Sequence, residues 1–267
     1  MIPMPTTTLA NPALMTATRY RVCPDVCFST DQDGTAILNV ERGKFHSLIG
    51  AGSTAWSKIA AHPEGIRLGM VVDDLLAKEE EFVGEPREKV ELAVARMLVT
   101  LAAIGLVETS DKPSARLSGS VRRWTSTALA TLGRRTTGLL IRWRRPCLAA
   151  LLELAMFQMI REIGRFSARH QVVKHWPIIA GQKNVPEDIS HLCAAVDEAA
   201  TWYPKESLCL QKASVTTCLL RQHGIPAEMK IGVRKQPFHS HAWVEVGGKV
   251  VGDHKGVQTY FKVIASW

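Results

Sequence analysis

Two strand-like runs joined by a pair of glycines constrain the fold of this chain more than any other feature. Residues 239–246 read HSHAWVEV, with apolar and polar side chains alternating, and KVV follows Gly247-Gly248. Alternation with a period of two is typical of a half-buried strand, and glycine pairs supply the backbone angles of a tight turn. The sequence therefore predicts an antiparallel β-hairpin over residues 239–251.

A helix precedes this hairpin. Residues 209–223 read CLQKASVTTCLLRQH, and Gly224-Ile225-Pro226 ends the run, because glycine favours a helix end and proline cannot continue a helix. Further helices are predicted over 146–170 and 186–203, and a further strand over 227–235. Helices followed by antiparallel strands indicate an α+β domain over residues 146–267.

The first part of the chain shows the opposite order, with strands before helices. Turn pairs at Asp33-Gly34 and Arg42-Gly43 separate short extended runs, and Pro86 opens the last helix, which stops at Gly105. The predicted strands cover 20–22 or 26–30, 36–39 and 44–48, and the predicted helices cover 51–61, 69–81 and 86–104. This order is typical of a winged-helix-like α+β domain, here over residues 19–110, and residues 1–18 are expected to be a flexible tail.

Positive charge is concentrated between the two predicted domains. The net charge is +8, and the segment from Lys112 to Arg145 holds nine basic residues and no acidic one. We predict that residues 111–145 form a solvated basic linker. A docking surface for an acidic partner is the alternative, followed by contact with nucleic acid or an anionic membrane.

The apolar segments and the cysteines bear on compartment and metal binding. The longest nearly uncharged apolar run, 146–160, is shorter than the about 20 residues that a membrane span needs. The N-terminus lacks the basic and apolar regions of a secretory signal, so the six cysteines are predicted to be reduced thiols in the cytoplasm. Cys23 and Cys27 have no second pair at zinc-site spacing, and no metal is predicted.

Cys209 lies in the first turn of its predicted helix, after Ser207 as a plausible N-cap. Free backbone N–H groups and the helix dipole at that position favour a thiolate. A nucleophilic thiol also needs a base, and His241 on the hairpin is the candidate. Structural roles are predicted for Cys218, about 180° round the helix, and for Cys193, because both lie in apolar segments.

The hairpin turn decides whether Asp253 can reach His241. A three-residue loop, Val246-Gly247-Gly248, places Asp253 directly opposite His241, where an aspartate can orient an imidazole. A two-residue loop, Gly247-Gly248, instead pairs Asp253 with Ala242 and turns it to the other face. A Cys–His–Asp site therefore requires the odd loop, or an aspartate just beyond the regular strand.

These residues resemble the leader peptidase of lasso-peptide biosynthesis, the B protein of such gene clusters. That family has a cysteine opening a helix, a strand ending in GVRK, a PF segment before HAWVE, and an aspartate after the hairpin. This chain has all of them: Cys209, Gly232-Val233-Arg234-Lys235, Pro237-Phe238, His241-Ala242-Trp243-Val244-Glu245 and Asp253. Gln211-Lys212 stands where the family often has an arginine. The resemblance implies a transglutaminase-like, papain-related fold in which Cys209 is the nucleophile, His241 the base and acid, and Asp253 the orienting residue.

Residues 19–110 resemble the peptide-recognition domain of the small chaperone of pyrroloquinoline-quinone synthesis. In that family a precursor's leader adds a strand beside the third strand and rests against the third helix, so that backbone hydrogen bonds give affinity. The resemblance implies these leader contacts here: Lys44, Phe45, His46, Ser47 and Leu48 on the strand and Arg96 on the helix.

Together the resemblances imply a leader peptidase for a ribosomally made precursor. The first domain would bind the leader, and the second would cleave the bond between leader and core. The freed core amine would pass to a separate, ATP-dependent, asparagine-synthetase-like cyclase that closes a macrolactam. The cysteine chemistry itself would need no cofactor, and ATP would enter only through the cyclase.

Two other functional classes fit parts of the sequence. A transglutaminase-like acyltransferase would use the same three residues and pass the acyl group to an amine instead of water. A winged-helix regulator that binds nucleic acid is disfavoured, because phosphate would be repelled by eight acidic residues within residues 73–91.

Overall fold

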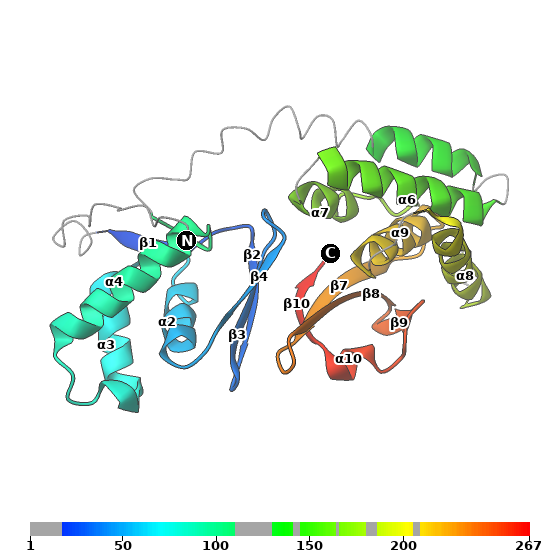
Figure 1. Ribbon diagram of the computed structural model, residues 1–267. Coiled ribbons are helices and arrows are strands. Elements are labelled where there is room, and N and C mark those ends of the chain that lie inside the picture. Colours follow the sequence, from blue (N-terminus) through cyan, green and yellow to red (C-terminus); the bar gives the residue numbers. More distant parts are fainter. Residues whose placement is uncertain (1–17, 110–129, 141–144, 164–165, 180–185, 205–208) are drawn as a thin grey trace. The chain divides into compact units, whose positions relative to one another are not determined.

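The computed structural model describes residues 18–109, 130–140, 145–163, 166–179, 186–204 and 209–267 (Figure 1). The predicted tail, apart from Thr18, and the predicted N-cap Ser207 lie outside the described residues, as does most of the basic linker. The chain divides into two compact units. The first comprises residues 1–26, 30–39 and 46–116, and the second comprises residues 27–29, 40–45 and 117–267.

A small antiparallel sheet joins distant parts of the first unit. Strand β1 (Arg19–Val22) lies between β5 (Ile66–Arg67) and β6 (Val107–Thr109). Tyr20 pairs with Ile66, and Val22 pairs with Val107. The sequence analysis missed β5 and β6, because strands of two and three residues are too short to show a period.

Three helices complete the first unit: α2 (Ala51–Ala60), α3 (Leu68–Lys78) and α4 (Arg87–Ala103). They share a core that includes the fully buried side chains of Trp56, Ile59, Val72 and Leu98. The predicted helix 69–81 is shorter than expected. It ends at Lys78, and the acidic stretch that follows forms the short 3-10 helix η1 (Glu80–Phe82).

A second sheet contains the predicted leader strand. Its order is β2 (Val26–Asp31), β3 (Gly34–Asn39) and β4 (Lys44–Leu48), so β3 is central and β4 is an outer strand. Gly34 has a φ of 115°, and a Cβ there would lie 2.3 Å from the Leu48 carbonyl oxygen. Glycine is therefore required where β3 begins.

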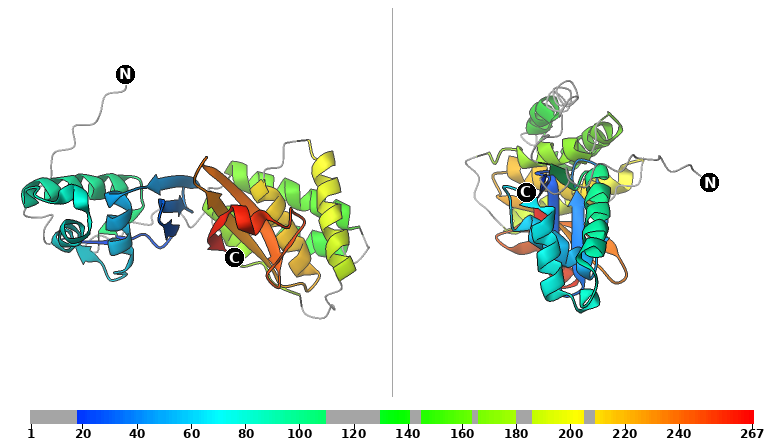
Figure 2. Two further views of the ribbon diagram at one scale, coloured as in Figure 1. Left: turned by 90° about the horizontal axis from the view of Figure 1, so that it is seen from below. Right: turned by 90° about the vertical axis from the view of Figure 1, so that its left-hand side faces the viewer.

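The second unit places helices on a four-stranded antiparallel sheet. The sheet order is β10 (Lys262–Ser266), β7 (Ala227–Arg234), β8 (His239–Val246) and β9 (Lys249–Val251). The helices are α6 (Pro146–Ile163), α7 (Phe166–Lys174), α8 (Pro186–Trp202) and α9 (Cys209–Gln222), and residues 130–140 are also helical. The sheet lies between α9 on one side and the short helix α10 (Val257–Tyr260) on the other (Figures 1 and 2).

The predicted helix 146–170 corresponds to α6 (Pro146–Ile163) and the first part of α7 (Phe166–Lys174), and residues 164 and 165 between them lie outside the described residues. Helix α10 and strand β10 were not predicted, since each is short and lacks a strong period. No helix among the described residues is long and apolar enough to cross a membrane.

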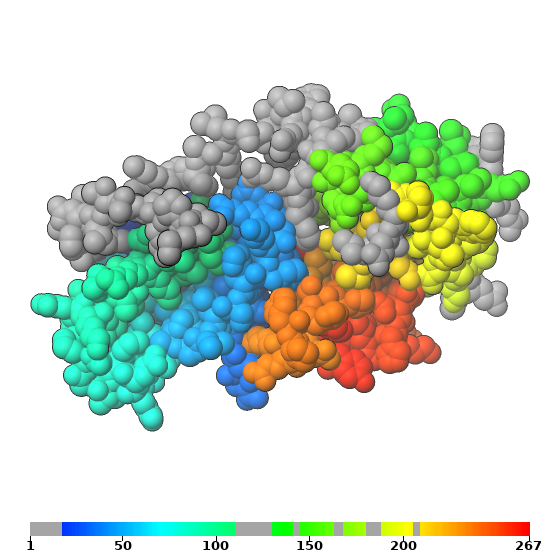
Figure 3. Space-filling view, viewed as in Figure 1, coloured from blue at the N-terminus to red at the C-terminus, as the bar shows by residue number. Residues whose placement is uncertain are grey.

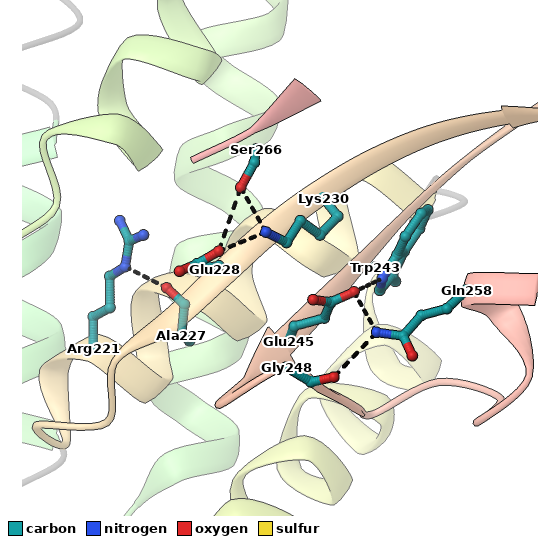
Figure 4. Close-up of polar contacts among 9 residues, drawn as sticks. All are labelled: Arg221, Ala227, Glu228, Lys230, Trp243, Glu245, Gly248, Gln258 and Ser266. Carbon is teal, nitrogen blue, oxygen red and sulfur yellow. Dashed lines mark hydrogen bonds and ion pairs between the residues drawn. The ribbon is translucent and has the colours of Figure 1, made fainter. Parts of the chain in front are cut away.

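Buried polar side chains tie the helices of the second unit to one another. Gln222 on α9 donates through Nε2 to Thr137 Oγ1 (2.8 Å) and to Glu153 Oε1 on α6 (3.0 Å). Burial raises the pKa of Glu153 well above its usual value. Arg221 donates to the Ala227 carbonyl at 2.8 Å (Figure 4) and to the Val173 carbonyl at 2.7 Å, and so holds α9 against β7 and α7. These contacts fix the helix that begins with Cys209.

Candidate active site

In the described residues helix α9 starts at Cys209, which the sequence placed in the first turn of its helix, and Cys209 is an exposed residue. Interactions with the His241 side chain on β8 and with the backbone N–H groups of Ala242 and Leu210 stabilise the thiolate form of Cys209. They lower the pKa of Cys209 below its usual value, with His241 the largest cause, against the opposing effect of burial. The thiol is therefore set up to be a thiolate.

The hairpin turn is the shorter of the two loops that the sequence left open. Val246 pairs with Lys249, and Val244 pairs with Val251, so the loop is the two-residue Gly247-Gly248. Both glycines have positive φ, 56° and 75°. Two adjacent residues with positive φ form the turn whose twist matches the flanking strands, which explains the shorter loop.

Asp253 nevertheless reaches His241, from beyond the regular strand. Strand β9 ends at Val251, and Gly252, with a φ of 66°, redirects the chain before Asp253. His241 Nε2 donates to Asp253 Oδ2 at 2.6 Å. This is the second of the two arrangements that the sequence left open, and it leaves Nδ1 of the imidazole for the thiol.

The pKa of His241 is raised to about 9. The hydrogen bond with Cys209 is the largest cause, and the hydrogen bond and negative charge of Asp253 add to it against the opposing effect of burial. A raised pKa on the imidazole and a lowered pKa on the thiol favour a thiolate–imidazolium pair at neutral pH. Such a pair is a nucleophile next to a proton donor.

Aromatic rings that the sequence analysis did not assign to the site surround His241. The Phe261 ring centroid lies 5.4 Å from that of His241, and the Trp243 ring lies nearly parallel to it, at 15° and 6.4 Å. Gly232 pairs with His241 across β7 and β8, and a Cβ at Gly232 would lie 2.7 Å from the Trp243 ring. A glycine inside the predicted strand 227–235 was the one available signal for this close approach.

Cys193 and Cys218, for which the sequence predicted structural roles, fit those roles. Cys218 and Cys193 are buried, and burial raises the pKa of both thiols, that of Cys193 to about 11. Thiols with raised pKa are poor nucleophiles at neutral pH. Among the described residues, no cluster of histidine, cysteine, aspartate and glutamate could hold a metal ion.

The predicted leader-contact residues lie on two elements. Residues 44–48 form β4, in which Lys44 and Ser47 are exposed and Phe45, His46 and Leu48 are half-buried. Arg96 lies on the exposed face of α4, between the exposed side chains of Leu92 and Val99.

Residues 147–266 match the Transglutaminase-like superfamily. They form a transglutaminase-like domain. This domain contains Cys209, His241 and Asp253, and its match agrees with the mixed helix-and-strand fold of the second unit.

A stretch of 60 residues is 43% identical to the Microcin J25-processing protein McjB of Escherichia coli, covering 22% of this chain and 29% of that protein. The chain therefore matches less than a third of the length of this relative. No solved structure matches the chain significantly. The resemblance to lasso-peptide B proteins, predicted from the residues, is confirmed by the domain match and this similarity.

Proposed function

We propose that this protein is a leader peptidase of lasso-peptide maturation, which cleaves a precursor between leader and core. The observation that carries the proposal is the arrangement of Cys209, His241 and Asp253 inside a transglutaminase-like domain. The similarity to a microcin-processing protein supports a precursor peptide as the substrate.

The chemistry needs no cofactor. The Cys209 thiolate attacks the scissile carbonyl carbon, and backbone N–H groups at the start of α9 stabilise the oxyanion. The C–N bond breaks as the His241 imidazolium gives its proton to the leaving core amine, and a thioester to the leader remains. Neutral His241 then takes a proton from water, the hydroxide attacks the thioester, and the thiolate departs. The sum is one water consumed, one leader acid and one core amine formed.

The alternative product distinguishes an acyltransferase from a peptidase. The test incubates precursor with the protein and measures product masses, with and without an added peptide amine. A peptidase gives two fragments whose masses sum to the precursor plus one water in both cases, whereas an acyltransferase gives chiefly a leader product that carries the added amine. A precursor left intact even with the cyclase and ATP present would overturn the peptidase proposal.

We infer that residues 19–110 form a winged-helix-like recognition domain whose β4 edge accepts the leader as an added strand. The outer position of β4 in its three-stranded sheet supports this role for residues 44–48, because strand addition takes place at a sheet edge. On α4 the exposed Leu92 and Val99 flank Arg96, opposite the buried side chains of the same helix. These two exposed aliphatic side chains would cover apolar residues of the leader. A leader held in this way presents its scissile bond at high effective concentration.

Replacing both Leu92 and Val99 by serine is expected to weaken leader binding by about 10- to 100-fold, from the loss of two partly buried aliphatic contacts. Fluorescence anisotropy of a labelled leader peptide measures the dissociation constant. Met70→Ser on α3 is the matched control, because Met70, Leu92 and Val99 are equally exposed at 48%. Equal affinity of the double variant and the control would remove α4 from the binding surface.

The free core amine calls for a second enzyme, and we propose an ATP-dependent cyclase as the partner that consumes it. The helical residues 130–140 lie at the surface of their unit (Figure 3) and expose Leu132 and Leu139 together with Arg134 and Arg135. Exposed leucines beside arginines suit a partner with an apolar surface and an acidic border. Replacing Arg134 and Arg135 by glutamate is expected to weaken the association measured by co-purification, and unchanged association would remove this surface from the proposal.

A further inference from the structure

A carboxylate on β8 links the strand that carries His241 to the segment that carries Asp253. We propose that Glu245 and Gln258 are positioning residues, which together hold the Asp253 segment in place against His241. This inference rests on the proposed function, in which His241 acts as base and acid.

The first half of the link runs along β8. His241, Trp243 and Glu245 are two residues apart, so their side chains lie in a row on one face of the sheet. Trp243 Nε1 donates to Glu245 Oε1 at 2.8 Å (Figure 4). The indole is 1% exposed and occupies the space above Gly232, where a Cβ would lie 2.7 Å from it. Glu245 thereby fixes the ring that packs beside His241.

The second half of the link runs from Glu245 to α10. Gln258 Nε2 donates to the same Glu245 Oε1 at 2.7 Å and to the Gly248 carbonyl oxygen at 3.2 Å (Figure 4). One amide group therefore ties α10 to β8 and to the β8–β9 turn. Asp253 lies between β9 and α10 in the sequence. Gly248 comes just before β9 and Gln258 lies in α10, so the Gln258 amide links the chain before this segment to the chain after it.

That intervening segment, residues 252–256, bonds to β8 through Asp253, packs against α8 through Gly252 and is shaped by local bonds. Gly252 lies against the Cys193 side chain, since a Cβ there would be 3.1 Å from Sγ. Asp253 Oδ1 accepts from the His254 backbone N–H at 2.7 Å, and Gly256 N–H donates to His254 Nδ1 at 3.1 Å. These local bonds shape the segment. Its distance from β8 depends on what holds α10, and Gln258 supplies the polar part of that hold.

The contacts close a ring that contains the proposed catalytic pair. It runs from His241 along β8 to Glu245, across to Gln258, back along the chain to Asp253, and across the 2.6 Å bond to His241. Val257 is buried and β10 follows α10 directly, so the fold is expected to survive the loss of the two side-chain bonds. The expected consequence is a looser His241–Asp253 contact, with a lower pKa for His241 and less thiolate at Cys209.

The test measures the rate of Cys209 alkylation by iodoacetamide against pH on the full chain, with Cys209 modification followed by peptide mass. Glu245→Leu removes the acceptor, Glu245→Gln keeps an acceptor oxygen without the charge, and Gln258→Ala removes the donor. Glu228→Ala is the matched control. Glu228 pairs with Glu245 across β7 and β8 and is bonded to Lys230 and Ser266, not to Gln258 (Figure 4).

In wild-type protein the thiolate–imidazolium pair should make Cys209 react well below the pH that an ordinary thiol needs. Glu245→Leu and Gln258→Ala are expected to lower the rate at pH 6 about tenfold, as the profile moves about one unit toward that of an ordinary thiol. Glu245→Gln and Glu228→Ala should keep the wild-type profile. Melting temperatures measured in parallel report any loss of stability.

Two results would overturn the inference. Lower melting temperatures in Glu245→Leu and Gln258→Ala with an unchanged alkylation profile would make the network structural only. A Glu245→Gln profile as defective as that of Glu245→Leu would assign the effect to charge instead of the hydrogen bonds. Alkylation uses no precursor, so the profiles decide this inference even if wild-type protein fails to cleave any peptide, which would refute only the proposed function.

Discussion

Cys209→Ala is expected to abolish precursor cleavage, with a loss on the order of 10⁶-fold, the scale seen when a triad loses its nucleophile. Cys209 is exposed and has a lowered pKa, whereas Cys193 and Cys218 are buried and have raised pKa values. Mass spectrometry of precursor and fragments over a time course measures the loss. Leader affinity should be unchanged, because the leader-contact residues are proposed on β4 and α4.

Cys147→Ala is the matched control for this variant. Cys147 also lies in the first turn of a helix, α6, yet its pKa is raised, by burial first and then by Glu198. A helix start alone therefore does not make a thiolate here, and His241 is the difference between the two cysteines. Cleavage that survives in Cys209→Ala, or that is lost in Cys147→Ala, would contradict the assignment of the nucleophile.

The local signals around the site predicted much of its structure. The stop at Gly224-Ile225-Pro226 predicted the end of α9 to within one residue, and the alternating run 239–246 matches β8. Each of these signals lies within one helix or strand. The spacing of apolar residues, or a residue that ends a helix, is enough to identify the element. The proposed nucleophile and base could therefore be located from the order of the amino acids alone.

Contacts between elements could not be predicted in the same way. The sequence allowed two registers for the hairpin, and only the φ angles of Gly247 and Gly248 decide between them. Phe261 follows a four-residue helix with no period, so nothing in the sequence placed its ring beside His241. Glutamine is common on protein surfaces, and nothing in the sequence indicates that Gln258 donates a hydrogen bond to Glu245. Tertiary packing, not local preference, determines these positions.

The pH dependence of cleavage should report the shifted pKa values of Cys209 and His241. The active thiolate–imidazolium form appears as pH rises through the lowered pKa of Cys209, and it is lost as pH rises through the pKa of His241, about 9. A plot of kcat/KM against pH should therefore be bell-shaped, with its alkaline limb near pH 9. The two groups interact, so the limbs report apparent values that belong to the pair.

Asp253→Ala is expected to reduce kcat/KM at pH 7 by about 10²- to 10⁴-fold, the range for loss of an orienting carboxylate. The carboxylate accepts the His241 N–H and is negatively charged, so both effects favour the imidazolium. Its removal lowers the pKa of His241, and the alkaline limb must move to lower pH. Asp253→Asn keeps an acceptor oxygen without the charge and should lose less activity than Asp253→Ala.

Asp197→Asn serves as the control for this series, because Asp197 forms an ion pair with Lys212 near the start of α9 and has no bond to His241. Its pH profile should match that of wild type. An alkaline limb that stays near pH 9 in Asp253→Ala would mean that the thiolate alone keeps the proton on His241. Asp253 would then act only by fixing the imidazole ring, and Asp253→Asn, which can still hold the ring, should recover most of the activity.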